Sequence, residues 1–298
     1  MTKIRLKPLL QNLSLTTLTF FNLLPTLTNS FYVPGVAPTD YADHDPVEIK
    51  AVKMTSSKTQ LPYEYYTLPL CKPDKVEYQS ENLGEVLRGD RIVNTGYSVK
   101  MNEIIGCKKL CEETLDKKSV DRFYNMIKNE YNVHFLADNL PAFTRWEVDN
   151  HEVQYEHGYK LGQAENDNIY LNNHLVFQLY YNEDEVTHSY RVVGFDVYPH
   201  SVAHDDITVD DNNDCHVDAG AAHRQEIKQG EDNVKVLFTY SVTWKESDIR
   251  WASRWDAYLE MGDVQIHWFS IVNSIVVVLF LAGILTMIIV RTLLGGVF

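Results

Sequence analysis

The amino-acid sequence predicts a mainly β protein, in which an antiparallel, sandwich-like domain with one minor helix is followed by a single membrane-spanning α-helix. The first observation is a period of two in the second half of the chain, where apolar and polar residues alternate over several strand-length segments. The second is that only one good amphipathic helix interrupts these segments. The third is a long uncharged apolar run near the last residue. Short alternating strands separated by turn-rich connections are typical of antiparallel sandwiches.

The first thirty residues, 1–30, have the order of a secretory signal peptide. A basic start precedes an apolar but threonine-rich middle, Pro25, and small or polar residues up to Ser30. A weak N-terminal membrane anchor is the alternative, because polar residues dilute the apolar run. We expect cleavage near Ser30, which leaves 31–262 as a lumenal β-rich domain.

A strand is expected over 47–54, within a proline-rich and tyrosine-rich region that excludes long regular elements. Alternation places Val47, Ile49 and Ala51 on one face and Val52 and Met54 on the other.

The best soluble helix is expected over 119–131. Ser119 is the expected N-cap, and an apolar stripe recurs at helical spacing. The stripe consists of Val120, Phe123, Tyr124, Ile127 and Tyr131. Such a stripe is more typical of packing on a sheet than of a cofactor site.

Strands are then expected at 175–180, 192–198 and 234–245, with a polar insertion over 205–223 between the last two. Residues 246–262 follow the last strand, and their tryptophans fall on one helical face. We expect a juxtamembrane helix there, with its aromatic side chains at the level of the lipid headgroups.

The apolar run sets the membrane topology. Residues 267–290 carry no acidic or basic side chain apart from His267, and at about 1.5 Å per residue they exceed the roughly 30 Å hydrocarbon core of a bilayer. We therefore predict a transmembrane helix over 267–290 and a short cytosolic tail over 291–298. Ser270, Asn273, Ser274 and Gly283 are small or polar residues within this helix. They favour contact with neighbouring helices, although the polar ones also lie within reach of the membrane interface.

The formal net charge of the chain is −14. So acidic a surface repels nucleic acid and anionic headgroups, so no nucleic acid is expected as a partner. The lipid bilayer is expected as a partner through the span and the juxtamembrane helix. An exported chain with an even number of cysteines predicts disulfides among Cys71, Cys107, Cys111 and Cys215, in one of three pairings. Cys107 and Cys111 could instead begin a metal site, but no second pair at zinc spacing follows.

No catalytic residue, metal site or cofactor is expected. The stretch 151–157 resembles a zinc-protease motif, but its histidines are six residues apart and it alternates like a strand. The tripeptide at 88–90, Arg-Gly-Asp, invites an adhesion interpretation, but turns favour Gly-Asp for backbone reasons. The acidic insertion suits a solvated face better than a calcium loop. Four histidines surround it and form a candidate sensor of organelle acidity: His200, His204, His216 and His223.

Five passages carry a family resemblance: FYVPGVAPTDY at 31–41, the run from DPVEIKAVKM to YEYYTLPLC at 45–71, SENLGEVLRGDRI at 80–92, FTYSVTWKES at 238–247 and RWASRWDAYL at 250–259. Together they resemble the transmembrane 9 superfamily, or nonaspanins, and most of all its larger members. The resemblance implies a signal peptide, a lumenal β-rich domain and nine spans, in Golgi and endosomal membranes. It also implies a non-enzymatic role in the sorting of other membrane proteins, which would be its cargo.

Only the first of these spans is present, so we expect either an incomplete chain, which we favour, or a true single-pass form. The alternative function is a single-pass receptor or adhesion ectodomain.

Overall fold

The computed structural model describes residues 38–79, 89–148, 152–166, 168–184, 188–217, 223–256 and 268–295. The N-terminal unit, Met1–Asp40, is described only over its last three residues. The signal peptide expected over 1–30 therefore lies outside the described residues.

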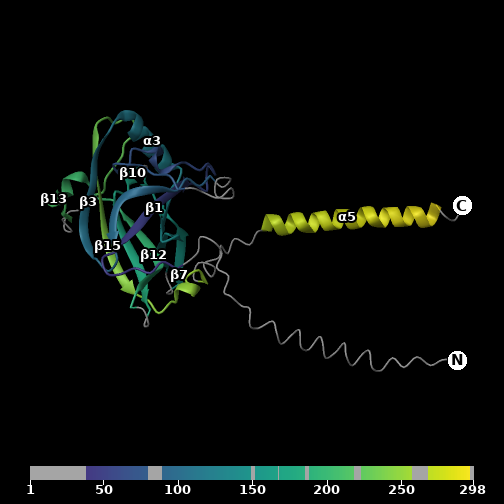
Figure 1. Ribbon diagram of the computed structural model, residues 1–298. Coiled ribbons are helices and arrows are strands. Elements are labelled where there is room, and N and C mark those ends of the chain that lie inside the picture. Colours follow the sequence, from purple (N-terminus) through teal and green to yellow (C-terminus); the bar gives the residue numbers. More distant parts are fainter. Residues whose placement is uncertain are drawn as a thin grey trace, which may run out of the picture. The chain divides into compact units, whose positions relative to one another are not determined.

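Strands dominate the described part of the chain (Figure 1). They are β1 (Pro46–Thr55), β2 (Val93–Lys100), β3 (Ile105–Leu115), β4 (Asn132–Ala137), β5 (Leu140–Pro141), β6 (Phe143–Val148), β7 (Glu152–His157), β8 (Tyr159–Lys160), β9 (Gly162–Glu165), β10 (Asn168–Leu171), β11 (His174–Glu183), β12 (Tyr190–His200), β13 (Ile207–Val209), β14 (Cys215–Val217) and β15 (Val234–Glu246). The helices are α3 (Lys117–Lys128), α5 (Trp268–Gly295) and three short 3-10 helices, η2 (Tyr65–Thr67), η3 (His204–Asp206) and η4 (Trp251–Ser253).

Two sheets form a sandwich around one core. The six-stranded sheet has the order β3-β15-β11-β12-β6-β7, and the five-stranded sheet has the order β2-β1-β4-β5 with β8 paired to β4. Phe135 of the second sheet and Phe177 of the first are both fully buried, and their ring centroids lie 6.2 Å apart. Aromatic contact across the two sheets confirms the sandwich architecture.

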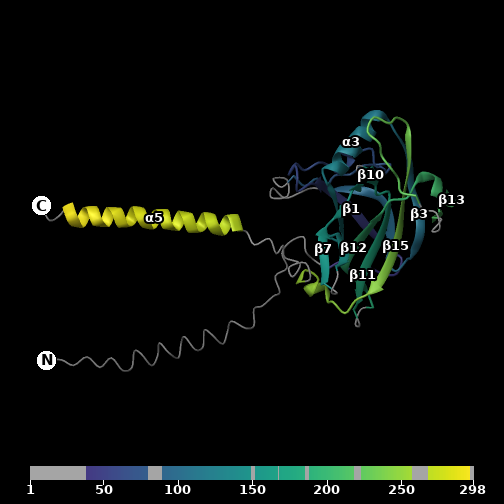
Figure 2. The same cartoon turned by 180° about the vertical axis from the view of Figure 1, so that it is seen from behind.

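The six-stranded sheet is mixed, whereas the sequence analysis predicted antiparallel pairing. β11 pairs antiparallel with β12 but parallel with β15, and β12 meets β6 in a parallel bridge. Figure 2 shows β11 between β12 and β15. β12 ends at His200, opposite His174 at the start of β11, and β15 begins near the same end of the sheet. The connection from His200 to Val234 therefore passes β11 at this end and places β15 on its other side, where it runs parallel to β11.

A β-bulge in β1 corrects the predicted faces of this strand. Val47, Ile49 and Ala51 are buried as expected, but Met54 is fully buried too. The register on β4 shifts between Ala51 and Lys53, so Val52 is an extra residue. One extra residue exchanges the two faces of the strand after it, and this places Met54 in the core.

The minor helix begins earlier than predicted and has a different cap. Helix α3 spans Lys117–Lys128, and the Asp116 carboxylate accepts a hydrogen bond from the Ser119 backbone N–H at 3.1 Å. Asp116 is therefore the N-cap and Ser119 lies in the first turn. Phe123 and Ile127 from the predicted stripe are buried in the sandwich core.

The segment after β15 differs from the predicted juxtamembrane helix. β15 itself extends to Glu246, and the described stretch that follows has the 3-10 helix η4, a turn at 254–255 and one helical residue, Asp256, at which this stretch ends. Arg254 is buried against the β domain: its guanidinium lies 2.6 Å from the Asp138 carboxylate and also donates to the Val192 carbonyl at 2.9 Å. Residues 257–262 lie outside the described part.

Helix α5 carries the predicted span. Ile271–Leu293 is long and apolar enough to cross a membrane, and it is the only such helix among the described residues. The helix continues beyond the predicted boundary at 290 to Gly295, so most of the expected tail over 291–298 is helical.

Candidate functional site

The predicted polar insertion forms a small hairpin, β13–β14, beside the edge strand β3. Its turn runs from Asp210 to Asp214, with Asn213 at a φ of 64° and a hydrogen bond from the Asp210 N–H to the Asp214 carbonyl at 2.8 Å. Asp and Asn tolerate such turn conformations. The acidic run is therefore a hairpin turn, an alternative that the sequence analysis did not weigh.

Two disulfides hold the neighbourhood of β3. Cys107 is bonded to Cys215 and thus ties the hairpin to β3, whereas Cys111 is bonded to Cys71. All four cysteines are paired, which excludes a metal site built on Cys107 and Cys111. Lys108 and Asp214 form an antiparallel bridge next to the first disulfide.

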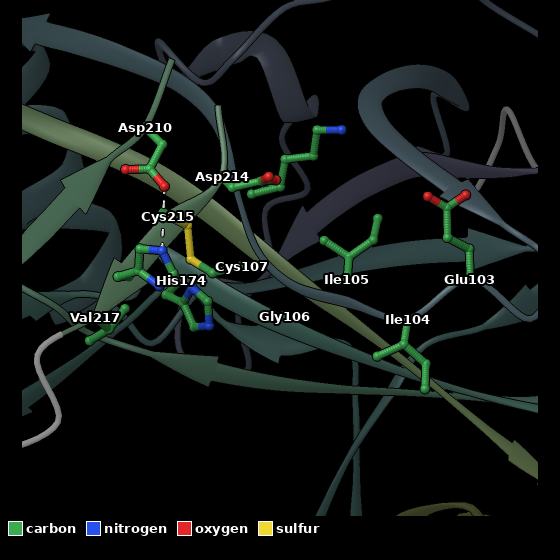
Figure 3. A pocket seen from close by; sticks show the side chains of 12 residues that line it. Glu103, Ile104, Ile105, Gly106, Cys107, His174, Asp210, Asp214, Cys215 and Val217 are labelled. Carbon is green, nitrogen blue, oxygen red and sulfur yellow. Dashed lines mark ion pairs between the residues drawn. A yellow bond between two sulfur atoms is a disulfide. The ribbon is translucent and has the colours of Figure 1, made fainter. Parts of the chain in front are cut away.

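A cleft of about 730 Å³ opens between the first half of β3 and the hairpin (Figure 3). Carboxylates, one lysine and apolar side chains line it: Glu103, Ile104, Ile105, Gly106, Cys107, Lys108, His174, Asp210, Asp214, Cys215, His216 and Val217. Its volume lies within the range of ligand-binding sites in proteins. We take it as the candidate functional site.

His174, at the start of β11, is a buried histidine in this lining. Its Nδ1 lies 2.8 Å from Thr239 Oγ1 and its Nε2 lies 3.2 Å from Ser241 Oγ. Because the Ser241 hydroxyl donates to the Gly106 carbonyl, it accepts from His174 Nε2–H, and Nδ1 accepts from Thr239. Burial lowers the pKa of His174 to about 4, so the ring is neutral at pH 7.

The hairpin also separates this cleft from a second one of about 420 Å³. His174 and Val217 line both clefts, and His200, Ser201 and Arg224 line the second. The two clefts are therefore neighbours that share a wall at His174 and Val217.

Three of the four histidines around the insertion pair with separate carboxylates, so the four form no common cluster. His204 lies 3.3 Å from both Asp205 and Glu112, as shown by the closest N–O distances. By the same measure, His216 lies 3.4 Å from Asp210 and His223 lies 3.1 Å from Asp206. Hydrogen bonds from Lys109 first, and from His204 second, lower the pKa of Glu112. Desolvation lowers the pKa of His200, although its side chain is exposed at the end of β12.

No group of three described His, Cys, Asp or Glu side chains is placed to hold a metal ion. His157 ends strand β7, in agreement with the expected strand over 151–157, and its ring packs on Phe143. His151 lies outside the described residues.

The adhesion interpretation of the tripeptide at 88–90 gains no support. The Asp90 carboxylate is largely buried and pairs with Lys53 at 2.5 Å. A Cβ at Gly89 would lie 2.8 Å from Pro62. Arg88 lies outside the described residues.

Sequence reasoning missed a polar cluster on the outer face of the six-stranded sheet. Arg145 lies over the rings of Tyr155 and Tyr180 and pairs with Asp196 at 3.1 Å, and Tyr180 donates to Asp196 at 3.0 Å. Burial raises the pKa of Asp196, although Arg145 opposes this effect. The Arg145 guanidinium and the Tyr180 hydroxyl both hold the Asp196 carboxylate in place, so we interpret the cluster as a structural network, although the buried Arg145 Nε has no hydrogen-bond partner among the described residues. The alternation of polar and apolar residues along these strands is the only sequence signal that could have indicated this cluster.

The fold and the site together define a disulfide-stapled β-sandwich with a groove, joined in one chain to a helix that is fit to span a membrane. The family model described as Endomembrane protein 70 matches residues 62–296. Human "Transmembrane 9 superfamily member 4" is 52% identical over 286 residues, which cover 89% of this chain and 44% of that protein. The chain therefore belongs to the transmembrane 9 superfamily, and the resemblance seen in the sequence is confirmed.

More distant relatives extend the comparison. "Transmembrane 9 superfamily member 8" of Arabidopsis thaliana is 44% identical over 283 residues, covering 89% of this chain and 43% of that protein. "Putative phagocytic receptor 1a" of Dictyostelium discoideum is 36% identical over 285 residues, covering 88% of this chain and 44% of that protein. The chain spans less than half the length of these curated relatives.

Proposed function

We propose that this protein acts without enzymatic chemistry in the trafficking, sorting or localisation of other membrane proteins, in Golgi and endosomal membranes. In this proposal the β domain is lumenal, the end of the chain is cytosolic, and other transmembrane proteins are the cargo.

The observation that carries the proposal is that one chain joins a β domain with two disulfides to an apolar helix fit to span a membrane. Membership of the transmembrane 9 superfamily supports it. Disulfides persist in oxidising compartments, which supports a lumenal position for the domain. The candidate site is a cleft lined by carboxylates and apolar side chains, with room for part of a partner protein.

The test is to delete the gene in cells that express the full protein and to quantify membrane proteins at the cell surface and in Golgi fractions by proteomics. We expect a subset of transmembrane proteins to change compartment without a change in total amount, and re-expression to restore them. An unchanged distribution, with the protein itself at the cell surface, would overturn the proposal.

The alternative is a receptor or adhesion protein of the cell surface, which the name of the Dictyostelium relative favours. Surface biotinylation of intact cells separates the two functions, because a sorting protein stays mostly unlabelled and a surface receptor does not.

A further inference from the structure

β3 and β14 begin a β-ladder and then separate. Lys108 and Asp214 form an antiparallel bridge, and the Lys109 N–H donates to the Asn213 carbonyl at 2.8 Å. The Cys107–Cys215 disulfide joins the next opposing residues, with Cα atoms 5.0 Å apart, as in a cross-strand pair. Among the described residues no further bridge joins the two strands, and the cleft opens at this point.

Gly106 lies in the wall of this opening. A Cβ added there would meet no atom within 4 Å, so the cleft leaves room beside the backbone of β3, although the Gly106 carbonyl itself already accepts from the Ser241 hydroxyl. The side chain of Ile104 on the same wall is 70% exposed, and Val217 faces the cleft from β14. The edges of β3 and β14 therefore face the cleft, with apolar side chains beside them. Such edges bind extended segments by β-augmentation, in which the segment pairs with the sheet as an added strand.

The charges of the lining favour a cationic ligand. Among the described lining residues, three carboxylates (Glu103, Asp210 and Asp214) accompany one lysine, Lys108. Glu103 lies 3.2 Å from Lys100, and Asp210 lies 3.4 Å from His216. Asp214 takes part in neither of these two ion pairs. His174 adds no positive charge at neutral pH, because its ring is neutral.

We propose that this cleft binds an extended peptide segment of a partner protein, in which apolar residues alternate with lysine or arginine. The segment joins the free edge of β3 as an additional strand. A period of two directs its apolar side chains toward Ile104 and Val217 and its cations toward the carboxylates. Binding by the β domain is independent of the proposed trafficking role, so either proposal can fail without the other.

The binding test uses the full chain in detergent micelles and two fluorescent octapeptides with blocked ends. One alternates lysine with valine and the other alternates glutamate with valine. Fluorescence anisotropy should show saturable binding of the lysine peptide, which added salt weakens, and at least tenfold weaker binding of the glutamate peptide. Equal binding of the two peptides, or no binding of the lysine peptide up to about 1 mM, overturns the proposal.

Variants of the cleft locate the binding. Gly106→Trp fills the opening and should weaken the lysine peptide at least tenfold, whereas the matched control Gly106→Ala leaves it open and should bind like the parent. Asp214→Asn should weaken binding several-fold, and Asp74→Asn, an exposed acid outside the cleft, should not.

If Gly106→Trp does not fold, Ile104→Lys gives the same information, because its exposed side chain tolerates substitution and the new cation repels the peptide. Parent-like affinity in a folded Gly106→Trp or Ile104→Lys variant contradicts the assigned site.

Discussion

Cys107 and Cys111 lie four residues apart on β3, yet their side chains lie on opposite faces of the six-stranded sheet. Cys111 packs against the sandwich core and pairs with Cys71, whereas Cys107 joins a small outer cluster with Cys215 and Leu237. In a regular strand, residues four apart share a face. Phe238 and Thr239 are consecutive in β15, but they pair with Cys111 and Lys109 of β3. Leu110 is therefore an extra residue, and this β-bulge exchanges the two faces of β3.

The two disulfides should therefore have different effects when removed. The pair Cys107→Ser with Cys215→Ser should release the β13–β14 hairpin and increase hydrogen exchange at 207–217, while the sandwich core stays protected. The pair Cys71→Ser with Cys111→Ser should leave exchange in the hairpin unchanged. The Cys107–Cys215 and Cys71–Cys111 disulfides close loops with sequence separations of 108 and 40. In the chain-entropy model these loops stabilise the fold by about 5 and about 4 kcal/mol, so denaturant unfolding should show a lower free energy of unfolding in each double variant. Equal hairpin exchange in the two double variants would contradict this division.

Arg254 should anchor the segment that leads to the span. Its side chain and that of Asp138 are 2% and 5% exposed, and its guanidinium also stacks on Trp251. Removing one partner of a buried ion pair leaves the other charge uncompensated, which costs about 3–5 kcal/mol. We expect Arg254→Ala to lower the free energy of unfolding by that amount and to make the chain after β15 sensitive to limited proteolysis.

The control for this prediction is Arg250→Ala, because Arg250 is exposed in the same segment. It should change stability by less than about 0.5 kcal/mol. Parent-like stability of Arg254→Ala would mean that the ion pair does not hold this segment.

His174 should make the β domain less stable in acid. Its pKa is lowered by burial, and to a lesser degree by His200, from 6.5 to about 4. A lowered histidine pKa means that the unfolded chain binds the proton first, so stability is complete above pH 6.5 and falls as the pH drops toward 4. At pH 5 this loss is about 2 kcal/mol.

Urea unfolding between pH 4 and 7.5 tests this dependence. His174→Asn should flatten part of the acid slope, and His134, whose pKa burial also lowers to about 4, should account for another part. His216→Asn is the matched control, because His216 is exposed. A slope that is identical in His174→Asn and in the parent would remove His174 from this role.

The sandwich, the minor helix and the span could be predicted because each depends on local periodicity. The faces of β1 after Val52 and the pairing of Cys107 and Cys111 could not, because a single extra residue in a bulge reverses every face after it. The parallel pairing of β11 with β15 could not be predicted either, because it depends on the side of β11 on which the long connection places β15.

The candidate site was predicted only in pieces. The acidic run, the histidines and the cysteines were each noticed, but the cleft exists because Cys215 lies opposite Cys107 across more than a hundred residues of sequence. The sequence analysis predicted a membrane-surface helix over 246–262, which includes Arg254, because Trp251 and Trp255 follow helical spacing. The burial of Arg254 results from Asp138, whose position at the turn after β4 is a tertiary feature.

The polar residues of the span remain a prediction about helix association. Ser270, Asn273 and Ser274 follow helical spacing on one face of α5, and Gly283 lies about 80° around the helix from Asn273. If that face contacts other membrane helices, Asn273→Leu should weaken association by about 0.6–1.7 kcal/mol, because an interhelical hydrogen bond is lost. Energy transfer between labelled chains and their membrane partners in bilayers would measure the change. Val277→Leu is the control, as it alters only apolar volume within the same helix, and equal association in both variants would assign Asn273 to the membrane interface instead.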